Sequence, residues 1–306
     1  MRALIRRELQ LLDLPSASGV EIVQEVAYII GDDSPFLYQL NAATLAGGGR
    51  TALFETAHFS SGRIPKDVKL DLECLTALTT PAGETGLLVL GSGATALREQ
   101  GFWVPLPVAG SGAGTVYPLG LSGLYTALRA LLPSGIVLNL EAATATETEL
   151  LLFQRTVGAA SGNMLFRLPL AATWAYLHHQ TTQLPAVHRQ LFELPVIDGK
   201  PAGFSGASWG AGQVFVTASV EDTQDAVLDG AVLGSFVGVL QLGSPGHRTV
   251  VPVTLAQLAW ADGRPYRGKV EGVAVLRPLA AGHYELLLVT DDDAGGSTAV
   301  TVELTM

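Results

Sequence analysis

The sequence predicts an all-β protein, a five-bladed β-propeller with six blades as the alternative, formed by one domain over residues 1–306. Three observations lead to this prediction. A short apolar segment with one polar residue recurs along the chain, a second aliphatic run follows each copy, and 35 glycines and 16 prolines supply turns. Such small sheets stack radially in a propeller, because neighbouring sheets supply the core that no single sheet can form.

The recurring segment is visible in five places: "SGVEIV", "LDLECL", "LNLEAA", "GFSGASW" and "GKVEGVAVL". Each places one polar anchor in an apolar frame, and the anchors are Glu21, Glu73, Glu141, Ser205 and Glu271. Intervals of 52, 68, 64 and 66 residues separate these anchors, so the period is loose but extends over the whole chain. A repeat of this length is typical of propellers and solenoids.

The runs that follow the anchors read as further strands. "VAYIIGDDS", "GLLVLGSGA", "ELLLFQRTV", "QVFVTASVED" and "ELLLVTDDD" are rich in aliphatic and β-branched residues and end in polar or acidic turns. Third strands are expected in "SPFLYQL", "GFWVPLP", "NMLFRLPL" and "STAVTVEL". The last repeat has three strands, so we expect the N-terminal segment "RRELQLLDL" to complete it and close the ring. "LSGLYTALRALLP" predicts a short helix between blades, with Ser122 as its cap.

Composition and charge exclude several classes of function. A net charge of −10 and a pI near 5.0 argue against nucleic-acid binding, which needs clustered lysine and arginine. "MRALIRR" is followed by no apolar signal region, and the longest apolar tract, "AVLGSFVGVLQL", is shorter than the ~18 residues of a membrane span. We therefore expect a cytoplasmic protein that does not associate with membranes, and a monomer. Cys74 is the single cysteine, and a buried strand thiol is its expected role.

The propeller prediction brings the polar anchors together. The start of each first strand and the end of each second strand lie on the same rim of a propeller, so anchors and turn residues meet at one mouth of the channel. The ligand-binding residues predicted there are Glu21, Lys69, Glu73, Glu141, Arg155, Ser205, Lys269 and Glu271. The predicted metal ligands, for calcium or magnesium, are Asp32, Asp33, Asp222 and Asp291. Ser92, Glu221, Asp292 and Asp293 belong to the same rim.

The distribution of lysines supports this convergence. The chain has four lysines, Lys66, Lys69, Lys200 and Lys269, and each precedes an anchor by no more than seven residues. Ammonium groups mixed with carboxylates at one rim fit recognition of a small anionic group, with a divalent cation held by the acids. The alternative is structural: the charges neutralise one another, and each glutamate accepts backbone hydrogen bonds from the neighbouring blade.

The segments "SASGVEIV", "IIGDDSPFLYQL", "LLVLGSG", "LNLEAA", "LLLFQR", "ASVEDTQDAVLDGAVLGSFVGVL" and "KVEGVAV…LLLVTDDD" carry a family resemblance. They resemble an uncharacterised bacterial β-propeller family that is similar in outline to phytase-like and esterase-like propellers. The resemblance extends over essentially the whole chain. The phytase-like group implies calcium-assisted phosphate-ester chemistry, although its dense acidic calcium clusters have no residue-by-residue match here.

Two functions from different classes follow. The first is a binding module for a small anionic ligand, a divalent cation or both. The second is a metal-assisted hydrolase of phosphate or carboxylic esters, in which Glu73, Glu141 or Glu271 holds a cation or acts as general base. Lys69 and Lys269 would stabilise negative charge in that reaction. "GASWG" fits the G-x-S-x-G pattern with Ser208 as nucleophile, but a strand follows it where that pattern needs a helix.

Overall fold

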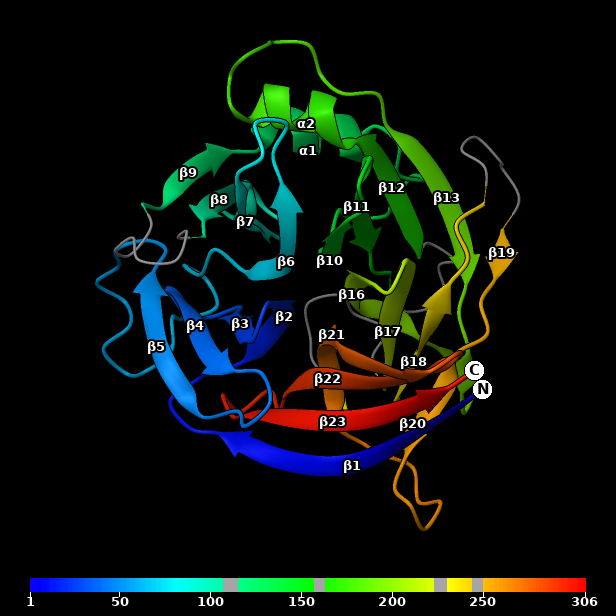
Figure 1. Cartoon of the computed structure of the whole chain (residues 1–306). Helices are drawn as coiled ribbons and strands as arrows, with labels where there is room; N and C mark the ends of the chain where they lie inside the picture. The colour runs from blue at the N-terminus through cyan, green and yellow to red at the C-terminus, as the bar shows by residue number, and fades with distance from the viewer. Residues whose placement is uncertain (107–114, 157–162, 223–229, 244–249) are drawn as a thin grey trace.

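The computed structural model describes residues 1–106, 115–156, 163–222, 230–243 and 250–306. Antiparallel sheets are arranged radially around a central axis, with the first strand of each repeat innermost, and the protein is a β-propeller (Figure 1). The first sheet contains β2 (Ala17–Val23), β3 (Val26–Gly31), β4 (Phe36–Asn41) and β5 (Gly47–Ala52). The next contains β6 (Leu72–Thr79), β7 (Thr85–Gly91), β8 (Gln100–Pro105) and β9 (Tyr117–Gly120).

The other sheets are larger. One has the order β10-β11-β12-β13-β19 and contains β10 (Leu140–Ala145), β11 (Glu149–Gln154), β12 (Met164–Pro169), β13 (His188–Glu193) and β19 (Val251–Pro252). A sheet of eight strands, in the order β16-β17-β18-β20-β1-β23-β22-β21, contains the remainder of the repeats. Its members are β16 (Gly203–Gly210), β17 (Gln213–Glu221), β18 (Val232–Leu240), β20 (Ala256–Ala259), β1 (Arg2–Leu11), β21 (Lys269–Ala280), β22 (His283–Asp291) and β23 (Ser297–Thr305). β14 (Val196–Ile197) and β15 (Lys200–Pro201) form a separate small hairpin.

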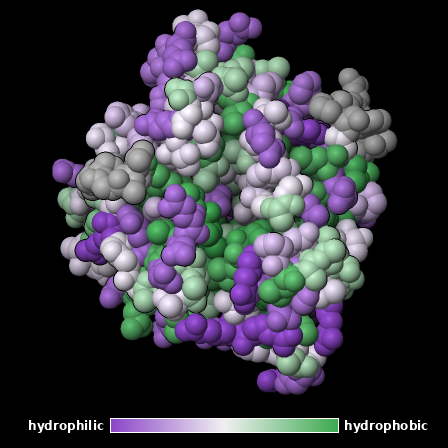
Figure 2. Space-filling view, in the orientation of Figure 1, coloured by the Kyte–Doolittle hydropathy of each residue, from purple (hydrophilic) through white to green (hydrophobic). Residues whose placement is uncertain are grey.

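Strand β1 joins the two ends of the chain. It pairs antiparallel with β23 from Arg2 opposite Thr305 to Leu11 opposite Ser297, and the termini lie side by side (Figure 1). On its other edge, Ala3 and Leu4 form a short parallel pairing with β20, which links two sets of strands into the eight-stranded sheet. The exposed edge of β1 carries a row of hydrophilic residues (Figure 2). Charged residues on such an edge oppose pairing with another chain.

The innermost strands form a closed ring around the channel. Neighbours contact one another in the order β2, β6, β10, β16, β21 and back to β2. Each of these strands has an irregularity near its start, where one residue is left out of the ladder; the residues are Ser18, Glu73, Glu141, Ser205 and Glu271. A bulge re-aims the side chain that it carries. Each bulged residue is followed by a small one, Gly, Cys or Ala, which allows close approach of the neighbouring inner strand.

The sequence-based choice of Glu21 as an anchor is corrected here. The residue equivalent to the other four anchors is Ser18, three positions earlier. Glu21 lies farther along β2, where its carboxylate accepts hydrogen bonds from the backbone N–H groups of Ile22 (3.0 Å) and Ala77 (3.2 Å). It fastens β2 to β6, as the structural alternative expected. Burial outweighs these two hydrogen bonds and raises the pKa of Glu21 to about 7.

Hydrophobic clusters lie between consecutive sheets. Ile30 of β3 packs with Leu87 of β7 in one cluster, and Phe153 of β11 packs with Phe204 of β16 in another, with ring centroids 5.1 Å apart. Each cluster draws side chains from two neighbouring sheets, so the sheets stabilise one another and burial of apolar area is shared around the ring.

Short helices cover part of the outer surface. α1 (Ser122–Arg129) confirms the predicted helix, but Ser122 is its first helical residue, and Leu121 occupies the N-cap without a side-chain hydrogen bond. α2 (Leu170–Leu177) was not predicted, because the apolar run before it continues from strand β12 without a break in hydropathy. Neither these helices nor η1 (Ala96–Arg98) are long and apolar enough to cross a membrane, and this holds for every helix in the described residues.

A substitution at Gly206 tests how tightly the inner strands approach one another. A Cβ atom at Gly206 would lie 2.5 Å from Thr217 Oγ1 and 2.8 Å from Gly272 Cα on the neighbouring strand. We predict that Gly206→Ala lowers the free energy of unfolding by about 1–3 kcal/mol, the usual cost of overpacking. Gly47→Ala, where a Cβ would meet nothing within 4 Å, should change it by less than about 0.5 kcal/mol. Urea denaturation of both variants measures the difference, and equal effects would contradict the packing argument.

Candidate functional site at the channel mouth

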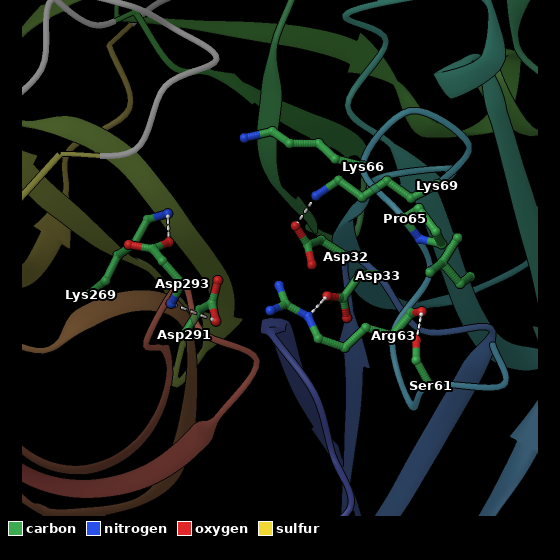
Figure 3. A pocket seen from close by; sticks show the side chains of 11 residues that line it. Asp32, Asp33, Ser61, Arg63, Pro65, Lys66, Lys69, Lys269, Asp291 and Asp293 are labelled. Carbon is green, nitrogen blue, oxygen red and sulfur yellow. Dashed lines mark hydrogen bonds and ion pairs between the residues drawn. The ribbon is translucent and has the colours of Figure 1, made fainter. Parts of the chain in front are cut away.

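One mouth of the central channel opens into a charged pocket. This mouth pocket has a volume of about 380 Å³ and lies between the turn after β3 and the turn after β22 (Figure 3). Its charged lining residues are Asp32, Asp33, Asp291 and Asp293 with Arg63, Lys66, Lys69 and Lys269. Below it the channel narrows to a neck with a cavity of about 10 Å³, lined by Ser18, Glu73, Glu141 and Glu271 among others. The neck has room for about one water molecule.

Lys69 organises one wall of the mouth pocket. Its ammonium group forms ion pairs with Asp32 and, at 2.8 Å, with Asp71. Asp71 also binds Arg98 at 2.6 Å and accepts a hydrogen bond from the Ser92 hydroxyl at 2.5 Å. Burial alone would lower the pKa of Lys69, but the surrounding carboxylates outweigh it and raise that pKa above its ordinary value. Lys69 is therefore a fixed positive charge at any physiological pH.

Arg63 closes the same wall toward solvent. Its Nε donates to Asp33 Oδ2 at 2.5 Å, and its Nη2 donates to the Ser16 hydroxyl at 3.3 Å. Ser16 in turn donates to the same Asp33 oxygen at 3.1 Å. Asp33 is held at Oδ2, while its other oxygen, Oδ1, is buried without a hydrogen-bond donor among the described residues. The Arg63 side chain remains 42% exposed, so part of the guanidinium can still meet a ligand.

Arg155 holds the carboxylates below the pocket. Arg155 is the residue directly after β11. Its guanidinium nitrogens lie 2.6 Å from a carboxylate oxygen of Glu221, 3.3 Å from one of Glu141 and 4.0 Å from one of Glu271. These residues are all buried, and burial of an ion pair is favourable only when the partners stay together. Burial would raise the pKa of Glu221, but Arg155 and Lys269 together hold it below the ordinary value.

Lys269 connects this buried group to the opposite wall of the pocket. Its Nζ lies 2.9 Å from Asp293 (Figure 3). It also lies 3.3 Å from Glu271 and 3.6 Å from Glu221. The three carboxylates outweigh burial and raise the pKa of Lys269 above its ordinary value. Lys69, in the connection before β6, and Lys269, at the start of β21, therefore lie on opposite walls of the pocket, each among carboxylates.

Some carboxylate oxygens of the site have no hydrogen-bond donor in the part of the chain that the structure describes. Among the described residues, no hydrogen-bond donor reaches the buried oxygens Asp32 Oδ1, Asp33 Oδ1 and Glu271 Oε2. Burial, with the nearby charge of Asp32, raises the pKa of Asp291 to about 7. Burial likewise raises the pKa of Glu271 to about 8 against the opposing charges of Lys269 and Arg155. Unpaired buried carboxylate is costly, and the site can be satisfied by protons or by an added cation.

A group of acids could hold a metal ion next to Lys69. Asp32, Asp71 and Glu73 each offer an oxygen, and these oxygens lie within 4.8 Å of one another. However, the Lys69 ammonium already binds Asp32 and Asp71 from this side. Burial and the charges of Glu141 and Asp71 raise the pKa of Glu73 well above its ordinary value, which favours the protonated carboxyl there. Asp32, Asp33 and Asp291 also line the mouth pocket, and two of their oxygens, Asp32 Oδ1 and Asp33 Oδ1, have no hydrogen-bond donor among the described residues.

The structure brings most of the predicted site residues together. Lys69, Asp32, Asp33, Asp291 and Lys269 line the mouth pocket, whereas Glu73, Glu141, Arg155 and Glu271 lie at or beside the neck. Three predicted residues lie elsewhere or are enclosed: Glu21 fastens two strands, Asp222 is exposed and pairs with Lys200, and Ser205 is buried under hydrogen bonds to Thr217 and Ser219. Asp222 and Lys200 pair with each other outside the pocket, so this lysine precedes an anchor without lining the mouth pocket.

Sequence reasoning missed three charged residues of the site. They are Arg63 and Asp71, in the connection that leads to β6, and Arg98, the last residue of η1. None of the three occupies a position that recurs in the repeats. The available signal was local for one of them, since Asp71 lies two residues before the anchor Glu73. Ser208 is buried in the β16–β17 hairpin, so the strand expected after "GASWG" is confirmed and the nucleophile geometry is absent from this part of the described chain.

Comparisons with known proteins give a family and distant structural likenesses. A model described as "Family of unknown function (DUF6929)" matches residues 13–304. No curated protein matches the sequence. Similar solved structures include the glutaminyl cyclase of Myxococcus xanthus (10% identity, TM-score 0.46, 99% of this chain and 97% of that chain covered). A Myceliophteria thermophila Cps50 (Swd1) β-propeller domain (8%, 0.39, 96% and 99%) and a glucose dehydrogenase (12%, 0.41, 98% and 100%) are also similar. At these TM-scores the likenesses carry no argument about activity.

Arg155 provides a test of the buried ion network. We predict that Arg155→Leu lowers the free energy of unfolding by about 3–5 kcal/mol, because it leaves buried carboxylates without their partner. Arg264→Leu, which removes an exposed arginine paired with Asp262, should change it by less than about 1 kcal/mol. Chemical denaturation at neutral pH distinguishes the two. Similar small effects would mean that the network contributes little.

Asp291 provides a test by pH. Its folded pKa of about 7 lies above the unfolded value near 4, so the folded protein keeps a proton that the unfolded chain releases between these pH values. This contribution to stability is complete below about pH 4 and is lost as the pH rises toward 7. Asp291→Asn removes the titration. The stability of the variant relative to wild type should therefore increase from pH 4 to pH 8, measured by denaturation at each pH, and a constant difference would contradict the raised pKa.

Proposed function

The chain belongs to this family of unknown function (DUF6929), and we propose that the protein binds a small anionic ligand together with a divalent cation at the channel mouth. The family itself implies no activity. The supporting observation is the mouth pocket itself. It joins fixed ammonium and guanidinium groups with carboxylate oxygens that have no donor among the described residues. Its volume of about 380 Å³ lies in the range of ~300–1,000 Å³ that is typical of small-molecule sites.

The cation would lie between Asp32 and Asp33 on one wall and Asp291 on the opposite wall, and water would bridge it to the carboxylates that it does not touch. Oxygen ligands of this kind suit calcium or magnesium, which takes water and ligand oxygens for its remaining positions. Asp33 is 2% exposed and lines the pocket, and its buried Oδ1 has no hydrogen-bond donor among the described residues. A divalent ion would lower the pKa of Asp291 and replace the proton that burial favours.

The anionic group would meet Arg63, Lys69 and Lys269. Lys69 and Lys269 remain charged because neighbouring carboxylates raise their pKa values, and Arg63 keeps part of its guanidinium exposed. Charge-assisted hydrogen bonds from such groups are stronger than neutral ones. The ligand would thus bridge two walls that come from different sheets, with the cation between its oxygens and the carboxylates (Figure 3).

This proposal treats residues 1–306 as one domain of five blades. The eight-stranded sheet divides naturally at the two-residue parallel pairing between β1 and β20. On one side lie β16, β17, β18 and β20, and on the other lie β21, β22, β23 and β1. The five inner strands that form the ring agree with this division, and the mouth pocket then lies between the first blade and the last.

Metal-assisted hydrolysis of a phosphate or carboxylic ester, as in phytase-like propellers, is the second candidate function. One observation favours it: the pKa of Asp291 is raised to about 7 beside Lys269, which is close to the value of an effective general base. In that case Asp32 and Asp33 would hold the cation without Asp291. Asp291 would then deprotonate a water molecule, while Lys69 and Lys269 stabilise the developing negative charge. Glu73, Glu141 and Glu271 line the neck, and in this reaction they would contribute negative charge next to the site.

Binding of the cation is tested by titration calorimetry with Mg²⁺ and Ca²⁺, with and without inorganic phosphate. We predict that either ion binds and raises the melting temperature, and that phosphate with Mg²⁺ raises it further. Asp291→Asn should weaken Mg²⁺ binding at least about tenfold, or about 1.4 kcal/mol. Asp262→Asn changes an exposed aspartate that is paired with Arg264 outside the pocket and should bind like wild type. Absence of binding in wild type, or equal loss in both variants, would refute the proposal.

Turnover separates the two candidate functions. With Mg²⁺ present, a panel of phosphate monoesters and carboxylic esters is assayed at pH 8, where Asp291 is deprotonated. Hydrolysis that disappears in Asp291→Asn and persists in Asp262→Asn would favour the hydrolase. Binding without hydrolysis across the panel supports the binding module.

A further inference from the structure

A second recess continues from the mouth pocket along the outside of the first sheet. This side recess has a volume of about 410 Å³ and shares Ser61 and Arg63 with the mouth pocket. Its other walls come from the segment after β1, from Phe59, and from the glycines 295 and 296. Two cavities with common lining residues can hold different parts of one molecule. The question is which chemistry the side recess would accept.

The side recess presents apolar side chains. Leu11, Leu12, Leu14 and Pro15 contribute to its lining, with Asp13 between them, and Phe59 contributes from another segment. Of these four apolar residues Leu12 is exposed, whereas Leu11, Leu14 and Pro15 are buried. Leu12 is 78% exposed, the largest exposed fraction among the exposed large hydrophobic residues of the described chain. Phe59 packs edge-on against Phe36 at 5.4 Å, so its ring is held in place. An exposed leucine beside a fixed aromatic ring favours an apolar ligand group.

Arg63 forms the boundary between the two cavities. It is anchored to Asp33 and Ser16 on the mouth side. On the other side it lies against Gly295, where a Cβ atom would come within 2.6 Å of Arg63 Cδ. Gly295 also has a φ of +97°, a region that disfavours other residues. The glycine thus permits the arginine to lie across the turn, with its charge available at the junction.

The side recess also carries a second arginine. Arg50 lies over the ring of Phe36, 4.1 Å from its centroid, and also lines the recess. Its guanidinium forms a hydrogen bond with the Tyr38 side chain as well. The charged side chains of the recess are therefore Arg50, Arg63 and the exposed Asp13, so that positive charge exceeds negative charge there.

We propose that the mouth pocket and the side recess form one composite site and that its ligand is an amphipathic anion. This inference rests on the proposed function. The anionic head group would bind in the mouth pocket with the cation, Arg63 would contact the head group at the junction, and an alkyl chain or aromatic ring would lie on Leu12 and Phe59. A short alkyl phosphate carries both features and serves as the probe.

The test compares methyl phosphate with hexyl phosphate by titration calorimetry in the presence of Mg²⁺, using the full chain. Hexyl phosphate should bind at least about tenfold more tightly than methyl phosphate, because burial of a methylene group contributes roughly 0.8 kcal/mol. Leu12→Ser should remove at least about threefold of this preference and leave methyl phosphate unchanged. Leu12 is exposed, so the variant is expected to fold. Leu279→Ser, at an exposed leucine outside both cavities, is the matched control.

The outcomes separate this inference from the proposed function. Equal affinity for the two esters would overturn the composite site and leave the binding of anion and cation in the mouth pocket intact. A preference for hexyl phosphate that Leu12→Ser does not reduce would mean that the hexyl group binds outside the side recess, and this result would also overturn the composite site. Failure of both esters to bind would overturn the composite site together with the proposed function.

Discussion

The charge balance around Arg155 and Lys269 is the constraint on which the channel depends. Closing the ring of inner strands directs the bulged residues Glu141 and Glu271 toward a narrow neck, where water cannot solvate them fully. Arg155 and Lys269 each contact Glu221 and Glu271, and Arg155 also contacts Glu141. Each positive charge is thus shared by carboxylates from several blades. The same interaction that permits buried acids also fixes the blades relative to one another.

The shared charges do not reach every carboxylate oxygen of the mouth, and the proposed binding site rests on this shortage. Lys69 and Arg63 each hold one oxygen of a neighbouring aspartate, while the second oxygens of Asp32 and Asp33 remain without donors among the described residues. On the facing wall, burial and the nearby charge of Asp32 raise the pKa of Asp291. A proton can relieve this excess only at one carboxylate. A divalent cation would relieve it at several, and an anionic ligand would then balance the added charge.

Much of this arrangement was predictable from the sequence. The recurring polar anchors and the aliphatic runs indicated the propeller, and the positions of Lys69 and Lys269 before anchors indicated the mouth. The register of the first repeat was not predictable, because "SGVEIV" contains both Ser18 and Glu21 and only strand pairing shows that Ser18 occupies the bulge. Arg63 and Arg98 approach the site through tertiary contacts that leave no periodic signal. The division between mouth pocket and side recess depends on one arginine lying against Gly295, which no pattern reports.

The most direct measurement of the central claim is anomalous diffraction from crystals grown with Mn²⁺ and phosphate. The account predicts a manganese peak coordinated by carboxylate oxygens of Asp32 or Asp33 and of Asp291, with a phosphate between the ion and the Lys69 and Lys269 ammonium groups. A manganese ion bound only on another face of the protein, or a mouth that contains neither ion at saturating concentration, would contradict it.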